Sequence, residues 1–336
     1  MEPNVNIGGD AQVTSFQEML DAKGYGGSIA SKLLHNNMDV KCLRTNETLL
    51  HEEWLEIDKA VIEAAHLRQV GIADLRSRNL VYTMNGMAKS VLAYQDMSDI
   101  EGADVSMDGV TKGERDRPEY NINYLPLPII FKDFSFSLRE LQESRNGSQP
   151  LDTTMAAASA NKVIEKAEEW LFQGSSSFTY GGGTIRGYQD APQRTTRAIG
   201  TSWTTDTGAN ILTDVRNAKQ DKIDDRHYGD AILYIPTAYE TVMDNDFTTN
   251  YPITIRERIL KMTGIQDIKV ADQLTADNVM LVQMTADVVR IVEGLPITTV
   301  QWSSGDGLRI FFKVMTILIP QVRNDQQSRS GIVHLS

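Results

Sequence analysis

Few residues of this chain have the types and spacing that chemistry requires. The glycines at 181–183 suggest a phosphate-binding turn, but no Lys-Ser or Lys-Thr pair follows them, and they do not lie between a predicted strand and a predicted helix. Asp224, Asp225 and His227 suggest metal ligation, but no second cluster of ligands completes the set. We therefore expect a flexible linker at 181–183 and the solvated end of a polar helix at 224–227.

The other nucleophiles and acid–base residues form no catalytic pattern. The five histidines are scattered, and neither H-E-x-x-H nor G-x-S-x-G is present. They are His35, His51, His66, His227 and His334. Cys42 is the single cysteine, so no intrachain disulfide can form, which fits synthesis in a reducing cytosol. The sequence therefore predicts a protein that is not an enzyme and has no catalytic residues, metal or cofactor.

Charge patterning offers a binding chemistry instead. Between Asp96 and Asp108 there are five acidic residues and no basic one, and Lys112, Arg115 and Arg117 follow. Such a run is either a solvated loop or a surface that contacts basic side chains. The sequence leaves both interpretations open.

The elements that position this acidic run form a long two-stranded ribbon over residues 76–124. The stretch RNLVYTMNGMAKSVLAYQDM is typical of a strand interrupted at Asn85-Gly86, a hairpin or kink signal, and YNINYLPLPII is the return strand. Two strands alone have too little apolar surface to be stable. We therefore expect the ribbon to lie on the body of its own chain or on a neighbouring subunit.

One helix precedes the ribbon, and one half-buried strand follows it. Residues 49–75 carry apolar side chains at helical spacing, which predicts an amphipathic helix. Residues 1–48 show little periodicity and are interpreted as an arm. In 132–138, Phe134 and Phe136 alternate with polar residues, as in a strand with one buried face.

The longest predicted helix covers residues 152–173. Asp152 is a suitable N-cap, and Gly174 follows the last helical residue as a C-terminal glycine would. One stripe of the helix is apolar and rich in small residues, which allows close packing on a sheet. It consists of Ala156, Ala160, Val163, Ala167 and Trp170 or Leu171. Ser159 is predicted to lie outside this stripe.

The second half of the chain predicts a mixed α/β domain. The Gly-, Ser- and Thr-rich stretch 174–210 is interpreted as a linker and as the main domain boundary. Helices and short apolar strands then alternate to about residue 295, including the buried strand AILYIP at 231–236. A final hairpin, 301–322, has a strongly apolar second strand that we place at the centre of a sheet.

The bulk properties are those of a globular, acidic chain. It has 336 residues, enough for about two domains, and a net charge of −12. No apolar run is long enough to span a bilayer, and the first residues do not have the pattern of a secretory signal. An acidic balance repels naked DNA and fits the wall of a container, although many cytosolic proteins are equally acidic.

Several stretches together resemble the encapsulin/linocin branch of the Hong Kong 97-type capsid superfamily, which includes the major capsid proteins of tailed phages. HEEWLEIDKAVIEAA resembles the N-terminal helix of that family. LPIIFKDFSFSLRELQESRNGSQPLDTTMAAASANKVIEKAEEWLFQG resembles its strand and spine helix, and YGDAILYIPTAYETVMDNDF resembles its axial lobe. The resemblance follows the chain in order and covers roughly residues 49–322.

The resemblance implies an α+β, Hong Kong 97-like viral capsid fold, with an N-terminal arm, an extended β-hairpin loop, and peripheral and axial domains. On this basis the arm is 1–48, the N-terminal helix 49–75 and the extended loop 76–124. The peripheral domain, with the spine helix at 152–173, would comprise 125–180 and 296–336, and the axial domain 181–295.

The implied function is that of a major capsid protein in the icosahedral head of a tailed phage, which encloses double-stranded DNA without sequence-specific contacts. The alternative is an encapsulin-like compartment that holds a protein cargo. The chain is longer than encapsulins, with an added arm, a longer ribbon, an insertion at 174–205 and a C-terminal tail, NDQQSRSGIVHLS, and these additions favour the phage. The implied partners are other copies of the chain in hexamers and pentamers, with scaffold, portal and decoration proteins as further candidates, and no membrane.

The implied location is the virion, with assembly in the cytoplasm of a bacterial host. In this setting the acidic run would meet basic residues of an adjacent subunit. The candidate inter-subunit residues are Asp99, Glu101, Asp104, Arg115, Arg117, Arg139 and Arg145, with Arg256 and Arg258 as further possible receivers. The sequence does not choose among these receivers.

Overall fold

The structure is a computed structural model of the whole chain. It describes residues 70–97, 105, 107, 117, 120–140, 154–248, 251–304, 308–324 and 329–336. The chain divides into two compact units. The larger contains residues 57–134, 152–300 and 312–336, and the smaller contains 1–56, 135–151 and 301–311.

A four-stranded sheet has the order β1-β13-β14-β4. Its strands are β1 (Val81–Thr83), β4 (Ile130–Ser137), β13 (Val289–Ser303) and β14 (Arg309–Val322). In the larger unit, Phe134 of β4 stacks on Phe312 of β14 with ring centroids 5.0 Å apart. The predicted C-terminal hairpin is confirmed, because β13 and β14 are neighbours. Burial alternates along β14 from Arg309 to Met315, and every residue from Thr316 to Val322 is buried.

The described part of the smaller unit is the continuation of these strands. The amide of Leu138 donates to the carbonyl of Leu308 at 2.9 Å, and the amide of Ser304 donates to the carbonyl of Arg309 at 2.9 Å. Trp302 stacks on Phe311 with ring centroids 5.7 Å apart. The strand alternation predicted for 132–138 is confirmed, since Phe134 and Phe136 are both buried.

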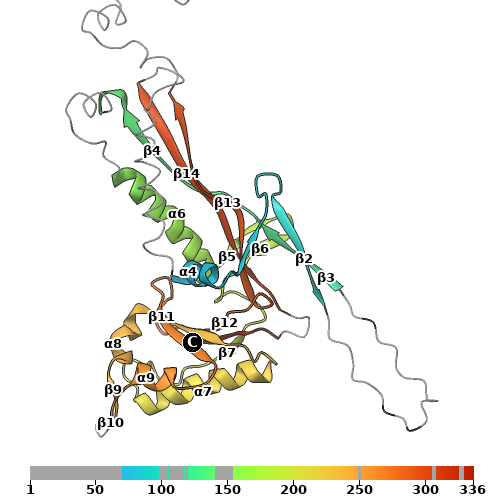
Figure 1. Ribbon diagram of the computed structural model, residues 1–336, viewed down its shortest axis with the longest axis vertical. Helices are drawn as coiled ribbons and strands as arrows, with labels where there is room; N and C mark the ends of the chain where they lie inside the picture. Colours follow the sequence, from blue (N-terminus) through green and yellow to red (C-terminus); the bar gives the residue numbers. More distant parts are fainter. Residues whose placement is uncertain are drawn as a thin grey trace, which may run out of the picture. The chain divides into compact units, whose positions relative to one another are not determined.

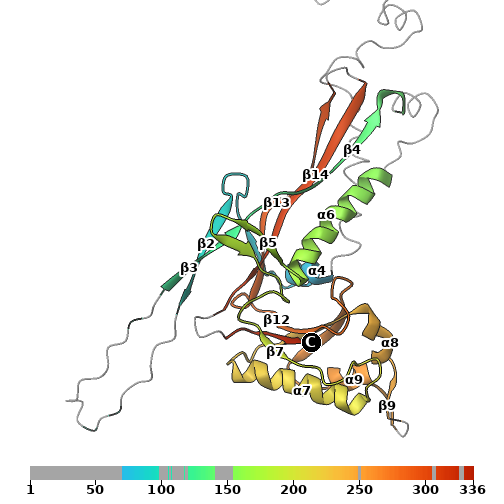
Figure 2. The same ribbon diagram turned by 180° about the vertical axis from the view of Figure 1, so that it is seen from behind.

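The predicted long helix is α6 (Thr154–Phe172), which runs beside β14 in both views (Figures 1 and 2). Gly174 follows it with φ +73°, the left-handed conformation that suits a C-terminal glycine. The predicted apolar stripe is buried. Ser159 is buried too, against prediction. The short helix α4 (Val70–Ser77) packs against the C-terminal part of α6. Helix α4 is the described end of the helix predicted at 49–75; residues 49–69 lie outside the described residues.

The predicted ribbon is β2 (Val91–Met97) paired antiparallel with β3 (Tyr120–Pro126). The Asn85-Gly86 signal is a kink rather than a hairpin, because β1 before it pairs with β13 and β2 after it pairs with β3. A Cβ on Gly86 would lie 2.8 Å from the Cα of Gly294, so the backbones meet too closely there for any side chain. The ribbon therefore begins at β2, later than the predicted residue 76.

The prediction of a flexible linker at 174–210 is wrong. The strands β5 (Ser175–Tyr180) and β6 (Gly183–Ile185) form an antiparallel hairpin. The strand β7 (Thr195–Arg197) is an edge strand of the five-stranded sheet described below. Gly181 and Gly182 make the hairpin turn with φ +59° and +81°, which explains the glycines without any phosphate. Short polar strands of this kind have little periodicity, so the composition was misleading.

The α/β domain is a lobe around a five-stranded sheet of order β11-β8-β12-β15-β7. Its further strands are β8 (Ala231–Ile235), β11 (Ile265–Val270), β12 (Val279–Gln283) and β15 (Ile332–Leu335). Helix α7 (Gly208–Asp224) begins at the N-cap Thr207 and covers one face of the sheet (Figure 1). The smaller elements are η2 (Thr237–Tyr239), α8 (Glu240–Met243), β9 (Asp246–Thr248), β10 (Tyr251–Thr254) and α9 (Ile255–Leu260).

Two segments lie in a different sheet from the one predicted. The C-terminal residues were predicted within 296–336 of the peripheral domain, but β15 lies between β12 and β7 in the lobe. Residues 289–295 were predicted in the axial domain, but they begin β13 of the four-stranded sheet. Both are short apolar strands whose place depends on partners far away in sequence. None of the helices in the described ranges is both long enough and apolar enough to cross a bilayer.

Candidate inter-subunit surface

One face of the β2–β3 ribbon exposes apolar side chains. Tyr120, Ile122 and Tyr124 alternate along β3, so they share a face, and they are 60%, 50% and 44% exposed. Opposite them on β2, Gln95 and Ala93 are also exposed. A two-stranded ribbon with an uncovered apolar face has little stability of its own. This face therefore offers a surface that a second protein surface can cover.

The opposite face of the ribbon mixes polar and apolar side chains and is partly buried. Asp96, the first residue of the predicted acidic run, is buried, and its carboxylate accepts a hydrogen bond from the Asn123 side-chain amide. Burial raises the pKa of the neighbouring Tyr94, Asp96 raises it further, and Arg323 and Arg186 oppose the shift. Asp96 is thus held inside its own chain and is neither a solvated loop residue nor a contact for another copy.

The residues predicted to make the inter-subunit contact are mostly outside the described residues. This applies to Asp99, Glu101, Asp104, Arg115 and Arg145. Arg117 and Arg139 are described and exposed, and their role stays a prediction. The two further receivers are partly engaged in the lobe.

Those two receivers interact with their own chain. Arg256 donates to Asp244 at 3.1 Å, and the Arg258 guanidinium lies 5.9 Å from the ring centroid of Phe247. Asp244 itself is well exposed, so this is an ordinary surface pair. The structure does not bring the predicted residues together within the part of the chain it describes.

The two chemical motifs that the sequence raised have structural explanations. A Cβ on Gly183 would lie 1.9 Å from the carbonyl oxygen of Tyr124, so the glycine permits close contact between β6 and β3. At the end of α7, Asp225 accepts from the Thr195 hydroxyl at 2.5 Å and Asp224 from Gln220 at 2.7 Å. Among the described residues there is no group of three or more His, Cys, Asp or Glu that could hold a metal ion.

His334 of β15 is a buried structural histidine. Its Nδ1 accepts from Arg194 at 3.2 Å, so its Nε2 carries the proton and donates to the Asn278 side-chain oxygen at 2.7 Å. Burial lowers the pKa of His334 to about 4, and Arg194 contributes to the shift. The ring therefore stays neutral at physiological pH.

A buried polar junction joins α4, α6 and the lobe. Glu168 of α6 is only 5% exposed, and its carboxylate accepts from the amides of Gly71 at 2.6 Å and Ile72 at 3.2 Å. A Cβ on Gly71 would lie 2.6 Å from Leu171 Cδ2, so glycine lets the two helices approach. Burial raises the pKa of Glu168 to about 7, while the two amides oppose the shift and Asp74 adds to it.

Asp74 continues the junction from α4 into the lobe. It is 4% exposed and accepts from the hydroxyl of Tyr234 on β8 at 2.8 Å and from the ammonium of Lys269 on β11. The nearby Tyr188 ring packs edge-on against Phe172 with centroids 5.5 Å apart. Its buried hydroxyl has no hydrogen-bond partner among the described residues. Lys269 thus pairs with the buried Asp74, whose charge also acts on Glu168, and these groups link the spine helix, α4 and the lobe.

Sequence reasoning missed this junction, although a signal for it was present. Glu168 lies four residues after Ile164 and four before Phe172, both of which are buried on α6. Helical spacing therefore places this carboxylate on the apolar face. A charged residue at such a position predicts a specific buried partner.

The geometry can now be compared with known proteins. Residues 44–335 match DUF6260, which is described as a family of unknown function. The chain belongs to the DUF6260 family.

Other proteins similar to this DUF6260 chain are named as shells and capsids. The type 1 encapsulin shell protein EncA of Myxococcus xanthus (strain DK1622) is 24% identical over 232 residues, which are 69% of this chain and 71% of that protein. The virus-like particle from Pyrococcus furiosus has a TM-score of 0.60 at 17% identity, over 85% of this chain and 99% of that chain. The capsid of Myoviridae phage XM1 has a TM-score of 0.61 at 12% identity, over 79% and 91%.

These similarities confirm the predicted α+β fold of the Hong Kong 97 type and the predicted resemblance to capsid and encapsulin proteins. At 17% and 12% identity, the similarity to the solved structures shows the fold alone. The relatives are structural shell proteins and not enzymes, which agrees with the prediction from the sequence. The DUF6260 chain thus has the fold of these shell and capsid proteins.

Proposed function

We propose that this chain is the major capsid protein of a tailed phage, which self-assembles into an icosahedral head around double-stranded DNA. The observation that carries the proposal is the β2–β3 ribbon. On a shell-type fold, it exposes Tyr120, Ile122 and Tyr124 on one face, as an element completed by a neighbouring subunit would. Each copy would both give and receive such a contact, and heterologous contacts of this kind close into rings and shells.

The phage assignment rests on the parts of the chain beyond the encapsulin-like segments. These parts are the predicted arm at 1–48 and the long acidic segment between β2 and β3, which are additional to the segments that resemble encapsulins. In this proposal the partners are other copies in hexamers and pentamers, the packaged DNA, and scaffold, portal and decoration proteins. The virion is the proposed location, after assembly in the cytoplasm of a bacterial host.

A second candidate function is an encapsulin-like compartment that holds a protein cargo. The similarity to the encapsulin shell protein over 71% of that protein favours it. Electron microscopy of the expressed chain separates the two. Large, variable or scaffold-dependent particles are expected for the phage protein, whereas small uniform shells formed without helper proteins would support the compartment.

The ribbon contact has its own test in the triple variant Tyr120→Ser, Ile122→Ser, Tyr124→Ser. We expect the subunit to stay folded by circular dichroism and particle formation to be lost, because the variant removes apolar surface that only a neighbour covers. Tyr228→Ser, which removes a single exposed aromatic of the lobe, is the matched control and should still assemble. Normal particles from the triple variant would contradict the assigned role of the ribbon, and a wild-type chain that stays monomeric with its assembly partners would contradict the function.

A further inference from the structure

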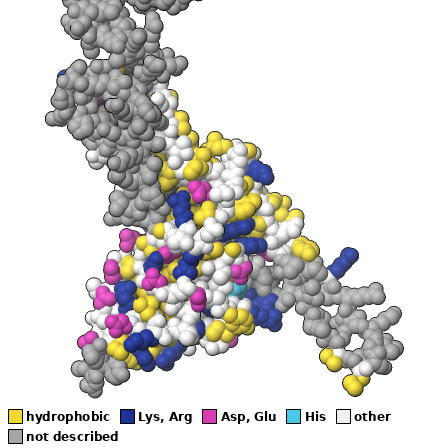
Figure 3. Space-filling view, viewed as in Figure 1, with side chains coloured by type: hydrophobic (Ala, Val, Ile, Leu, Met, Phe, Trp, Pro, Cys, Tyr) yellow, Lys and Arg dark blue, Asp and Glu magenta, His cyan; other side chains and the backbone are white. Residues whose placement is uncertain are grey.

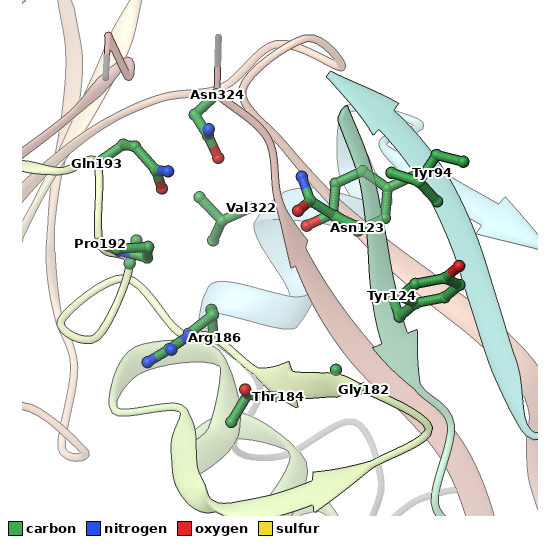
Figure 4. A pocket seen from close by; sticks show the side chains of 13 residues that line it. Tyr94, Asn123, Tyr124, Gly182, Thr184, Arg186, Pro192, Gln193, Val322 and Asn324 are labelled. Carbon is green, nitrogen blue, oxygen red and sulfur yellow. The ribbon is translucent and has the colours of Figure 1, made fainter. Parts of the chain in front are cut away.

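A polar cleft lies beside the ribbon, within the larger unit. Its volume is about 220 Å³. The ribbon strands form one wall, and the turn and loop around β6 and the residues after β14 form the others (Figure 4). The lining residues that matter here are Tyr94, Asn123, Thr184, Arg186, Gln193 and Asn324.

The cleft presents polar groups that the described chain leaves without partners. The side chains of Tyr94, Thr184 and Gln193 make no hydrogen bond to another described residue. Asn123 uses its amide nitrogen on Asp96, which leaves its side-chain oxygen as an acceptor. Gln193 and Asn324 face Asn123 and Tyr94 across the cleft in Figure 4. Amides and hydroxyls arranged in this way suit an extended peptide, which needs both donors and acceptors.

Two arginines lie at or next to the cleft: Arg186 lines it, and Arg323 stands in sequence between the lining residues Val322 and Asn324. Burial and then Asp96 raise the pKa of Tyr94, and the charges of Arg323 and Arg186 oppose the shift. Arg186 pairs with Asp190 at 2.9 Å. Neither Arg290 nor Arg323 has a carboxylate partner in the described part of the chain, and burial and then the charge of Arg323 lower the pKa of Arg290. Figure 3 shows Lys and Arg side chains spread over the visible face, and most of the visible Asp and Glu in its lower part.

The chain contains a segment with the complementary chemistry. Residues 98–108 carry Asp99, Glu101, Asp104 and Asp108 and no basic residue. Val105 and Met107, the two described residues of this segment, are 97% and 105% exposed, so their own chain does not cover them. Of the receivers suggested by sequence, Arg256 is paired with Asp244 and Arg258 lies over Phe247, whereas Arg323 has only a weak 3.4 Å contact to the Ala286 carbonyl.

We propose that the cleft beside the ribbon receives the acidic segment, residues 98–108, of a neighbouring copy of the chain. The carboxylates would pair with Arg323 and Arg186, and the peptide backbone would hydrogen-bond to Gln193 and Asn123, with the Tyr94 hydroxyl donating to a carboxylate. This inference rests on the proposed shell function and names the receiving surface that the sequence leaves open. Opposite charges at such a contact set the register between copies more than the affinity.

Charge reversal and its rescue test the pairing. Arg323→Glu together with Arg186→Glu, and separately Asp99→Lys together with Glu101→Lys and Asp104→Lys, should each lower the yield of particles at least about tenfold while the subunit stays folded. Combining the two sets should restore particles, because the charges are again opposite. Arg216→Glu, on the exposed face of α7, is the matched control and should assemble normally.

The results distinguish a failure of this inference from a failure of the proposed function. If the wild type assembles but the arginine reversals are harmless, or the combined variant is no better than its parents, the cleft is not the receiver and the shell function stands. If the wild type forms no particles with its assembly partners, the function is wrong and the inference falls with it.

A disulfide test identifies the occupant directly. In a Cys42→Ser background, Gln193→Cys with Ala103→Cys should give a ladder of linked subunits on a non-reducing gel after oxidation of assembled particles. Tyr228→Cys in place of Gln193→Cys is the control and should give none. A link confined to single chains would show that each segment enters the cleft of its own chain, and the absence of any link would show that the segment lies elsewhere; either result overturns the proposal.

Discussion

The lobe core and the α4–α6 junction are equally hidden from water, but they are built from opposite chemistry. The lobe packs side chains such as Leu233, Leu281 and Val333, all fully buried, between the sheet and α7. The junction buries two carboxylates, Glu168 and Asp74, against backbone amides, a tyrosine and a lysine. Apolar burial is tolerant of pH, whereas a buried carboxylate depends on whether it carries a proton.

The difference teaches where this molecule can respond to its surroundings. His334 lies in the lobe sheet, but its pKa of about 4 keeps it neutral from mildly acidic pH upward. Glu168, on the spine helix, has a pKa of about 7 and accepts a hydrogen bond from α4. Asp74 of α4 in turn accepts a hydrogen bond from Tyr234 of the lobe. Near neutral pH, we therefore expect the junction, and not the lobe, to make the stability of the subunit pH-dependent.

The largest expected effect is a cavity in the lobe. Leu281→Ala on the central strand β12 should lower the free energy of unfolding by about 2–5 kcal/mol, because the removed side chain is fully buried among other strands and helices. Urea unfolding of the unassembled subunit measures it, and the change should be the same at pH 5 and pH 8. Ile122→Ala, on the half-exposed ribbon face, is the control and should change subunit stability by less than about 0.5 kcal/mol. If both variants lowered the free energy of unfolding equally, the ribbon face would be as important for subunit stability as the lobe core, against expectation.

The next effect is a pH dependence carried by Glu168. The folded pKa of about 7 lies above the ordinary value of 4.5, so this contribution to stability is fully present below pH 4.5 and is lost as the pH rises through 7. At about 1.4 kcal/mol per pKa unit, the loss is on the order of 3–4 kcal/mol. Burial is the largest cause of the raised pKa of Glu168, the charges of Asp74 and Asp272 add to it, and the Gly71 and Ile72 amides oppose it.

Glu168→Gln tests this pH dependence. Glutamine keeps an acceptor for the α4 amides and cannot titrate, so the free energy of unfolding should change much less between pH 5 and pH 8 than in the wild type. Glu165→Gln, which removes the exposed pair with Lys162 on the same helix, should leave the slope unchanged. A Glu168→Gln subunit with the wild-type slope would place the titrating group elsewhere.

The smallest effect tests how closely α4 and α6 approach. Gly71→Ala should cost about 1–2 kcal/mol, because the new Cβ would lie 2.6 Å from Leu171 Cδ2 and the leucine must move. Gly200→Ala is the matched control, since no atom lies within 4 Å of its Cβ, and it should be neutral. Thermal unfolding of both variants gives the comparison; a neutral Gly71→Ala would mean that the helices have room to separate.

Much of the fold was predictable because its signals are local. Each of these signals lies within one element. They are the apolar stripe and terminal glycine of α6, the apolar pattern of α7 and the buried run of β8. The β2–β3 pairing was predictable from two strands around a polar segment. The sequence predicted that the ribbon must lie against another surface. It did not predict the cleft beside the ribbon.

The cleft and the sheet memberships were not predictable because they join distant segments. Val333 of β15 pairs with Thr195 of β7, and Arg323, Gln193 and Tyr94 come together from three separate elements. The polar hairpin at 175–185 had the composition of a linker, and only its contacts with β3 make it an ordered element.

The order of residues along this chain was enough to establish its helices, its ribbon, the absence of a catalytic motif and its likeness to shell proteins, because each depends on neighbours in sequence. Folding in three dimensions added the burial of Glu168 and Asp74, the capture of Asp96 by Asn123 and the insertion of β15 into the lobe. Those features depend on the free energy of packing between elements, and no local pattern encodes which distant surface a side chain will meet.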